Sequence, residues 1–166
     1  MPERSGAVVV NTTPIIALAL IGQLDLLQHL YSEVVIPPAV QAEMLAGGPD
    51  SIGAAELQGA NWIQTVSLQD PRRADLLSDL DRGEAEVIAL AQELKSELLI
   101  VDERLARRHA KRLGLTLTGT IGILLKAKER GLVPAVGPLI DQLRQSGIWL
   151  DDALVTEALR LAGEEA

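Results

Sequence analysis

Residues 7–14 read AVVVNTTP, a β-branched apolar run that stops at three small polar residues and a proline. Val8–Val10 predict a buried parallel strand, because no polar residue alternates with the valines. Pro14 suits the first turn of a helix, and either threonine before it can cap that helix. Asn11 is therefore expected where a central strand ends and a helix begins. In open α/β sheets, sites are built at that edge.

The middle of the chain alternates helical and strand patterns most clearly. Helices are predicted over 83–95, 103–113 and 120–130, and strands over 98–101 and 115–117. This alternation is typical of a parallel sheet with helices on both faces.

The remaining segments extend the same pattern. Further helices are predicted over 14–21, 23–30, 37–45, 51–58, 134–145 and 151–161, weak helix over 71–80, and strands over 33–36 and 62–66. No repeat or long linker interrupts them. We therefore expect one α/β domain over residues 1–166, with a central parallel sheet of four to five strands.

Composition limits the class of protein. Hydrophobic residues make up 48% of the 166 residues, which argues against disorder. Cysteine is absent, which excludes disulfides, thiolate zinc sites and a cysteine nucleophile, and which fits a reducing cytoplasm. The N-terminus has no signal-peptide pattern, and the apolar run 15–21 is too short to span a bilayer. We expect a cytoplasmic protein that does not enter membranes.

The charge distribution bears on nucleic-acid binding. A net charge of −8 argues against a general nucleic-acid binder, yet eight of the fifteen Lys and Arg residues fall between Arg104 and Arg130. Two Trp and one Tyr are the only aromatic residues, so base stacking on an aromatic platform is not expected.

Three acidic residues occupy positions where a site could form. Asp102 ends the strand over 98–101, on the same sheet edge as Asn11, although it could simply cap the next helix. Glu84 shares a helix face with apolar residues, although acids are also favourable in a first helical turn, and that explanation suffices for Glu86. Glu43 flanks another apolar stripe, although taken alone it fits a solvated helix position.

Together these positions predict a cation site. Clustered carboxylates repel one another and raise each other's pKa unless a cation lies among them. The donors on offer are carboxylate oxygens and the amide of Asn11, which suit Mg²⁺ or Mn²⁺ and not zinc. A magnesium ion held in this way activates water and neutralises the charge of a phosphodiester.

A basic helix follows directly. Arg104, Arg107, Arg108, Lys111 and Arg112 share one face, with Leu105, His109 and Leu113 expected on the opposing stripe. This face could contact an RNA backbone, with Arg104 the best candidate because it is nearest to Asp102. For the distal arginines an ordinary solvated face is the favoured interpretation.

An ordered set of segments carries a family resemblance. The segments are VVNTTPIIAL, VIPPAVQAE, LDRGEAEVIALA, LLIVDER and LTLTGTIGIL, and they extend from residue 7 over most of the chain. The chain resembles PIN domains, and more narrowly the PIN-like proteins related to VapC-type toxins. The resemblance implies a three-layer α/β/α fold and RNA cleavage with Mg²⁺ or Mn²⁺ held by three or four acids.

The resemblance also implies roles for individual residues. Glu43, Glu84 and Asp102 match the second, third and fourth acids of the family. Thr12 and Thr13 match the small hydroxyl positions that order the first loop. Asn11 stands where the family has its first aspartate. An amide brings no charge, so we expect weaker metal binding.

Three functional classes follow from these observations. The first is a metal-dependent endoribonuclease, the toxin of a type II toxin–antitoxin module. The second is a PIN-like module that binds RNA or protein without cutting, which Asn11 favours. The third, a phosphoryl-transfer or receiver domain, is disfavoured because Asn11-Thr12-Thr13 provides no acid directly after the first strand. The resemblance further implies a homodimer and a small cognate antitoxin.

Overall fold

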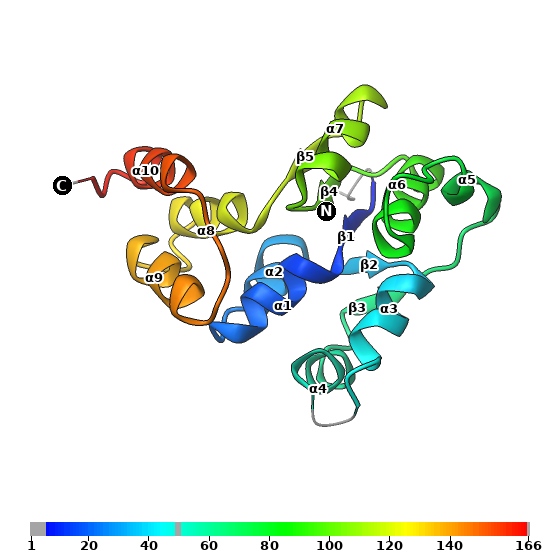
Figure 1. Cartoon of the computed structure of the whole chain (residues 1–166). Helices are drawn as coiled ribbons and strands as arrows, with labels where there is room; N and C mark the ends of the chain where they lie inside the picture. Colours follow the sequence, from blue (N-terminus) through cyan, green and yellow to red (C-terminus); the bar gives the residue numbers. More distant parts are fainter. Residues whose placement is uncertain (1–5, 49–50, 166) are drawn as a thin grey trace.

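The computed structural model describes residues 6–48 and 51–165. Five parallel strands form one sheet in the order β3-β2-β1-β4-β5 (Figure 1). The strands are β1 (Val8–Val10), β2 (Val34–Ile36), β3 (Ile63–Thr65), β4 (Leu98–Ile100) and β5 (Leu117–Thr118). The predicted parallel α/β sheet is confirmed.

The strand order reverses between β1 and β4. From β1 the chain builds β2 and β3 on one side, then crosses back to place β4 and β5 on the other. Val10 lies opposite Ile100 in the register, so Asn11 and Asp102 follow the ends of neighbouring strands. A crevice at such a reversal, beyond the carboxyl ends of the strands, is the usual place for a ligand.

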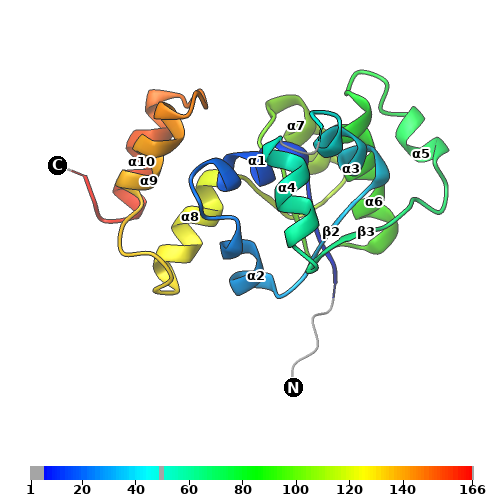
Figure 2. The same cartoon turned by 90° about the horizontal axis from the view of Figure 1, so that it is seen from below.

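Helices cover both faces of the sheet. Helix α6 (Arg82–Leu94) packs on β1 and β4 and contacts α3 (Pro38–Leu45), α5 (Arg72–Asp75) and α7 (Arg104–Arg112). Helices α1 (Thr12–Leu20) and α2 (Asp25–Tyr31) each contact α8 (Thr120–Glu129), and α4 (Ile52–Gly59) packs against α1. Helices α9 (Gly137–Gln145) and α10 (Asp152–Leu161) lie beyond α8 in both views (Figures 1 and 2). The arrangement is the three-layer α/β/α fold expected from the sequence.

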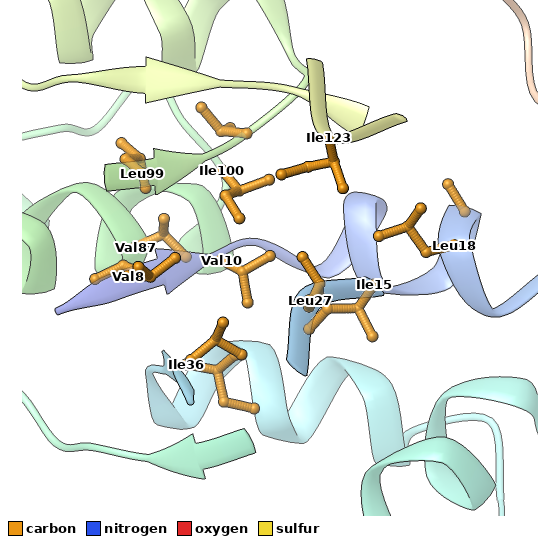
Figure 3. Close-up of a cluster of buried hydrophobic side chains, with 14 of the residues drawn as sticks. Val8, Val10, Ile15, Leu18, Leu27, Ile36, Val87, Leu99, Ile100 and Ile123 are labelled. Carbon is orange, nitrogen blue, oxygen red and sulfur yellow. The ribbon is translucent and has the colours of Figure 1, made fainter. Parts of the chain in front are cut away.

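The core lies between these layers. Side chains of β1, β2 and β4 meet those of α1, α2, α6 and α8 (Figure 3). The three valines of β1 are at most 1% exposed. Burying each such side chain contributes roughly 1.5–3 kcal/mol, so β1 is held firmly at the centre of the fold.

Several boundaries differ from the sequence-based expectations. Helix α1 begins at Thr12 and has Asn11 as its N-cap, so the prediction that a threonine caps this helix was wrong. The two threonine hydroxyls bind glutamate carboxylates instead. Strand β5 begins two residues later and ends one residue later than predicted, and the weak helix over 71–80 is reduced to the four residues of α5.

Among the described residues, no single helix is long and apolar enough to cross a membrane. Helices α1 and α2 reach that length and composition only as a pair, and they are bent by 117° at their connection.

Candidate active site at the carboxyl edge of the sheet

Asn11 joins the ends of β1 and β4. Its backbone N–H donates to the carbonyl of Ile100 at 3.0 Å, and its side chain is 3% exposed. The amide Nδ2 donates to Oε2 of Glu103 at 3.3 Å, while Thr13 Oγ1 donates to Oε1 of the same carboxylate at 2.7 Å. Glu103 is thus fixed against the start of α1, and the amide oxygen of Asn11 is left for other contacts.

Three side-chain oxygen atoms from separate elements lie close to Gly83. A Cβ atom placed on Gly83 would lie 2.8 Å from Glu43 Oε1, 3.6 Å from Asp81 Oδ1 and 3.9 Å from Asn11 Oδ1. We call Asn11, Glu43 and Asp81 the Gly83 oxygen cluster. Thr12 Oγ1 donates to Glu43 Oε1 at 3.0 Å and so orients that carboxylate. The approach is close because glycine has no side chain, and the space is lined by hydrogen-bond acceptors.

Glu84 lies beside this cluster, in the first turn of α6. Its backbone N–H donates to Asp81 Oδ1 at 2.8 Å, and its Oε1 accepts from the N–H of Asp81 at 3.3 Å, which forms a capping box. Burial raises the pKa of Glu84, and the charges of Asp81 and Glu103 raise it further. Helix capping therefore accounts for the position of Glu84, as the first-turn alternative predicted, and leaves its carboxylate near two other acids.

Asp102 binds the start of α8, not the helix that follows it. Its Oδ1 accepts from the N–H of Thr120 at 2.7 Å, and its Oδ2 accepts from the hydroxyl of Thr120 at 2.6 Å. Glu103 is the N-cap of α7 and makes no side-chain cap bond there, so the expectation that Asp102 could cap α7 was wrong. A Cβ on Gly119 would lie 2.5 Å from Asp102 Oδ1, so glycine is needed beside this carboxylate.

Burial has the largest effect on the pKa of Asp102. Burial raises its pKa, and the charge of Glu103 adds to that rise. The two hydrogen bonds from Thr120 and the charge of Arg107 oppose it. Because Glu103 raises the pKa of both Glu84 and Asp102, it is the electrostatic neighbour that these two acids share.

A comparison with protein families identifies the group to which this arrangement belongs. A family model described as a PIN domain matches residues 7–164. The chain belongs to the PIN-domain family. PIN domains are generally nucleases and typically use divalent metal ions. None of the curated proteins matches the chain.

The acids of this PIN domain do not form one closed metal centre in this conformation. Across residues 6–48 and 51–165, no three acidic or histidine side chains lie close enough together to hold a metal ion. Asn11 and Glu43 share the Gly83 oxygen cluster, Glu84 is bound to Asp81, and Asp102 is bound to Thr120. The donor set is nevertheless made of oxygen alone, which fits Mg²⁺ or Mn²⁺.

Sequence reasoning missed several polar residues of this PIN domain. Glu103 and Asp81 contribute carboxylates near the predicted acids, and Gly83 and Thr120 shape the space around them. The pair of consecutive acids at 102–103, directly after a strand, was the signal that could have identified Glu103.

Glu86 was also misjudged. First-turn electrostatics was expected to explain it, but the residue is 9% exposed and its Oε1 accepts from the N–H of Ala39 at 3.0 Å. Its Oε2 accepts from Arg82 Nε at 2.8 Å. Helix α6 is covered by α3 as well as by the sheet, so Glu86 joins two helices and takes no part in the predicted site.

Helix α7 of the PIN domain packs differently from the expected stripe. Ala106 and Ala110 are its buried residues, while Leu105 and Leu113 are exposed. Small side chains let α7 approach α6 closely, so the larger leucines lie outside the contact. His109 takes no part in the predicted site, and its Nε2 lies 2.9 Å from Oδ2 of Asp79. Arg104 is exposed and lines a pocket with Asp102.

Proposed function

We propose that this PIN domain is a divalent-metal-dependent endoribonuclease and acts as the toxin of a type II toxin–antitoxin module. The observation that carries the proposal is the Gly83 oxygen cluster, in which side-chain oxygen atoms of Asn11, Glu43 and Asp81 all lie within 4 Å of the Cβ position of Gly83. Such an arrangement favours a cation.

Glu43, Glu84 and Asp102 are the carboxylates that would hold the metal ion, with the amide oxygen of Asn11. When bound, the ion would supply a nucleophilic water and neutralise charge on the phosphodiester. Thr12 and Thr120 orient two of these carboxylates, and Thr13 holds Glu103 against Asn11. The protein's own contribution is therefore to position oxygen donors at the carboxyl edge of β1 and β4.

The proposal includes the partners that go with this role. The substrate is single-stranded RNA, with Thr12, Thr13 and Arg104 on the substrate side of the acids. The protein forms a homodimer in the cytoplasm and is inhibited by a small cognate antitoxin. These points rest on the likeness to VapC-type toxins among PIN domains.

A second function is favoured by one contact. The hydrogen bond from Asn11 to Glu103 satisfies both groups without a metal ion, as expected of a PIN-like module that binds RNA or a protein without cutting. Tight Mn²⁺ binding by the unaltered protein, measured by titration calorimetry, would exclude that second function.

The test of the first function is cleavage of a labelled single-stranded RNA with MnCl₂ and with EDTA. We expect cleavage with Mn²⁺ only, and its loss in Asp102→Asn. Asp152→Asn is the control, because Asp152 is an exposed acid on α10 that pairs with Arg144. Cleavage that EDTA leaves undiminished contradicts the proposal.

A further inference from the structure

Helix α7 is rich in basic residues. Within the two described segments, no ion pair involves Arg104, Arg107, Arg108, Lys111 or Arg112. Elsewhere in those segments five arginines do pair with a carboxylate, namely Arg72, Arg73, Arg82, Arg144 and Arg160. The chain has 23 acids for 15 Lys and Arg residues, so a shortage of acids does not explain the contrast.

Four of these cations line a pocket that begins at the candidate active site. The pocket has a volume of about 390 Å³ and is lined by Asp102, Arg104, Arg107, Arg108 and Lys111. Arg107 Nη1 donates to the carbonyl of Val101 at 2.8 Å, which fixes it at the end of β4. Arg104, Arg108 and Lys111 are exposed, so their charged groups are available to a ligand.

We propose that this pocket binds backbone phosphates of the RNA strand that the Asp102 edge acts on, an inference that rests on the proposed ribonuclease function. Arginine donates two parallel hydrogen bonds to phosphate oxygens, and lysine adds a point charge. Arg104 and Lys111 are seven residues apart, which is about 10 Å along a helix and leaves room for more than one phosphate.

The composition of the pocket determines what is recognised. No aromatic side chain lines it, so bases have no surface on which to stack. Contacts to phosphate alone carry no sequence information, so binding here is independent of base identity. The carboxylate of Asp102 repels phosphate at the inner end, which directs the anion toward Arg108 and Lys111.

An acidic peptide is a different polyanion that this surface could attract. RNA is favoured because the same pocket contains Asp102, an acid of the proposed catalytic edge, so a bound strand would already lie beside it.

The test measures binding of a labelled single-stranded RNA by fluorescence anisotropy in EDTA, over a range of KCl concentrations. The variant is Arg104→Gln/Arg108→Gln/Lys111→Gln. The matched control is Lys95→Gln/Lys126→Gln/Arg130→Gln, which removes the same charge from positions that line no part of the pocket. Glutamine is a good helix former, so the α7 variant should keep its fold. Circular dichroism checks the fold of both triple variants.

Each single-strand phosphate contact contributes about 0.7 to the slope of log affinity against log salt, so the α7 variant should lose about 2 in slope and about tenfold or more in affinity. The control variant should bind like the unaltered protein, and oligo-U and oligo-A should bind alike. Equal losses in both triple variants, or no RNA binding at all, would overturn the proposal. So would α7-dependent binding of a polyglutamate peptide without RNA binding.

The metal-free assay separates this inference from the proposed function. A protein that binds RNA through α7 but does not cleave it with Mn²⁺ retains the phosphate pocket and lacks the nuclease activity. A protein that cleaves RNA, and whose α7 variant binds and cleaves equally well, retains the nuclease activity and lacks the phosphate pocket.

Discussion

Asn11 donates its side-chain amide to Glu103, with 3.3 Å between Nδ2 and Oε2, at the place where β1 and β4 end side by side. The bond joins the N-cap residues of α1 and α7. An aspartate at position 11 would face Glu103 with a second negative charge. The neutral amide therefore removes a repulsion, at the expense of one charge that a cation would use.

An aspartate at position 11 should lower the stability of the metal-free protein and increase its affinity for Mn²⁺. In Asn11→Asp the buried carboxylate faces Glu103 without a proton to share, which should cost about 1–3 kcal/mol in EDTA. Mn²⁺ should then raise the melting temperature by more than it does in the unaltered protein, because ligand charge strengthens binding. Differential scanning fluorimetry with and without MnCl₂ measures both effects.

The double variant Asn11→Asp/Glu103→Gln is the control. It reverses the donor and the acceptor while keeping the net charge of the unaltered protein, so its stability in EDTA should recover. A single Asn11→Asp variant that is more stable in EDTA, and that gains nothing from Mn²⁺, would show that repulsion does not govern this contact.

Gly83 provides a steric test of the oxygen cluster. In Gly83→Ala the new Cβ would lie 2.8 Å from Glu43 Oε1 and must displace that carboxylate. The displaced group is the end of a flexible side chain, and alanine favours helix, so the fold should keep its stability. Mn²⁺ affinity, measured by calorimetry, should fall about tenfold or more. Unchanged Mn²⁺ affinity would place the cation elsewhere.

The sequence predicted the fold well because local patterns determine it. Continuous apolar runs such as Val8–Val10 identify buried parallel strands, and strand ends identify the edge where Asn11 and Asp102 lie. The order of strands and helices then leaves few topologies to consider. The strands and their parallel arrangement could therefore be inferred without coordinates, whereas the order β3-β2-β1-β4-β5 was not predicted.

The contacts of the acids could not be inferred in the same way. Asp102 binds Thr120, eighteen residues later, because α8 begins directly after β5, which pairs with β4. Glu86 binds the start of α3, forty-seven residues earlier, because α3 packs on α6. Such partners depend on how helices dock, and a helical pattern shows only which residues share a face.

The pH dependence of metal binding should follow the buried acids. Burial raises the pKa of both Asp102 and Glu84, and a metal ion needs both groups deprotonated. Mn²⁺ affinity should therefore increase as the pH rises through the carboxyl range, and level off above the raised pKa values. Calorimetric titrations from pH 4 to pH 8 would measure it. A flat profile would mean that these two carboxylates do not bind the ion.

The raised pKa values of Asp102 and Glu84 have the opposite effect on the stability of the metal-free protein, which they lower as the pH rises. A raised pKa means that the folded state holds the proton more tightly, so this contribution to stability is full below the ordinary carboxyl pKa and is lost as the pH rises through the raised value. Asp102→Asn should therefore be at least as stable as the unaltered protein at pH 7 in EDTA, because a neutral amide can still bond with Thr120. A marked drop in its melting temperature would contradict this account of Asp102.

Glu164 provides a prediction on stability alone. Its carboxylate accepts from Lys128 Nζ and from the N–H groups of Val136 and Gly137, each at 2.8 Å, and so binds the start of α9. The Lys128 hydrogen bond and the two backbone bonds lower the pKa of Glu164 from 4.5 to about 2. In Glu164→Gln the side-chain NH₂ group would face one of these donors and could not accept a hydrogen bond from it. The free energy of unfolding at pH 7 should fall by about 1–2 kcal/mol.

Urea unfolding of Glu164→Gln and of the control Glu165→Gln measures that cost. A lowered pKa gives stability that is full above 4.5 and is lost as the pH falls through about 2, so the deficit of Glu164→Gln should shrink in acid. Glu165 is the exposed neighbouring acid, and its variant should match the unaltered protein. RNA binding in EDTA should not change, because α9 lies far from α7, the helix that carries the basic residues of the Asp102 pocket (Figure 1). A deficit that stays constant from pH 7 to pH 2.5 would mean that packing at α9, and not the ionised carboxylate, is what the substitution removes.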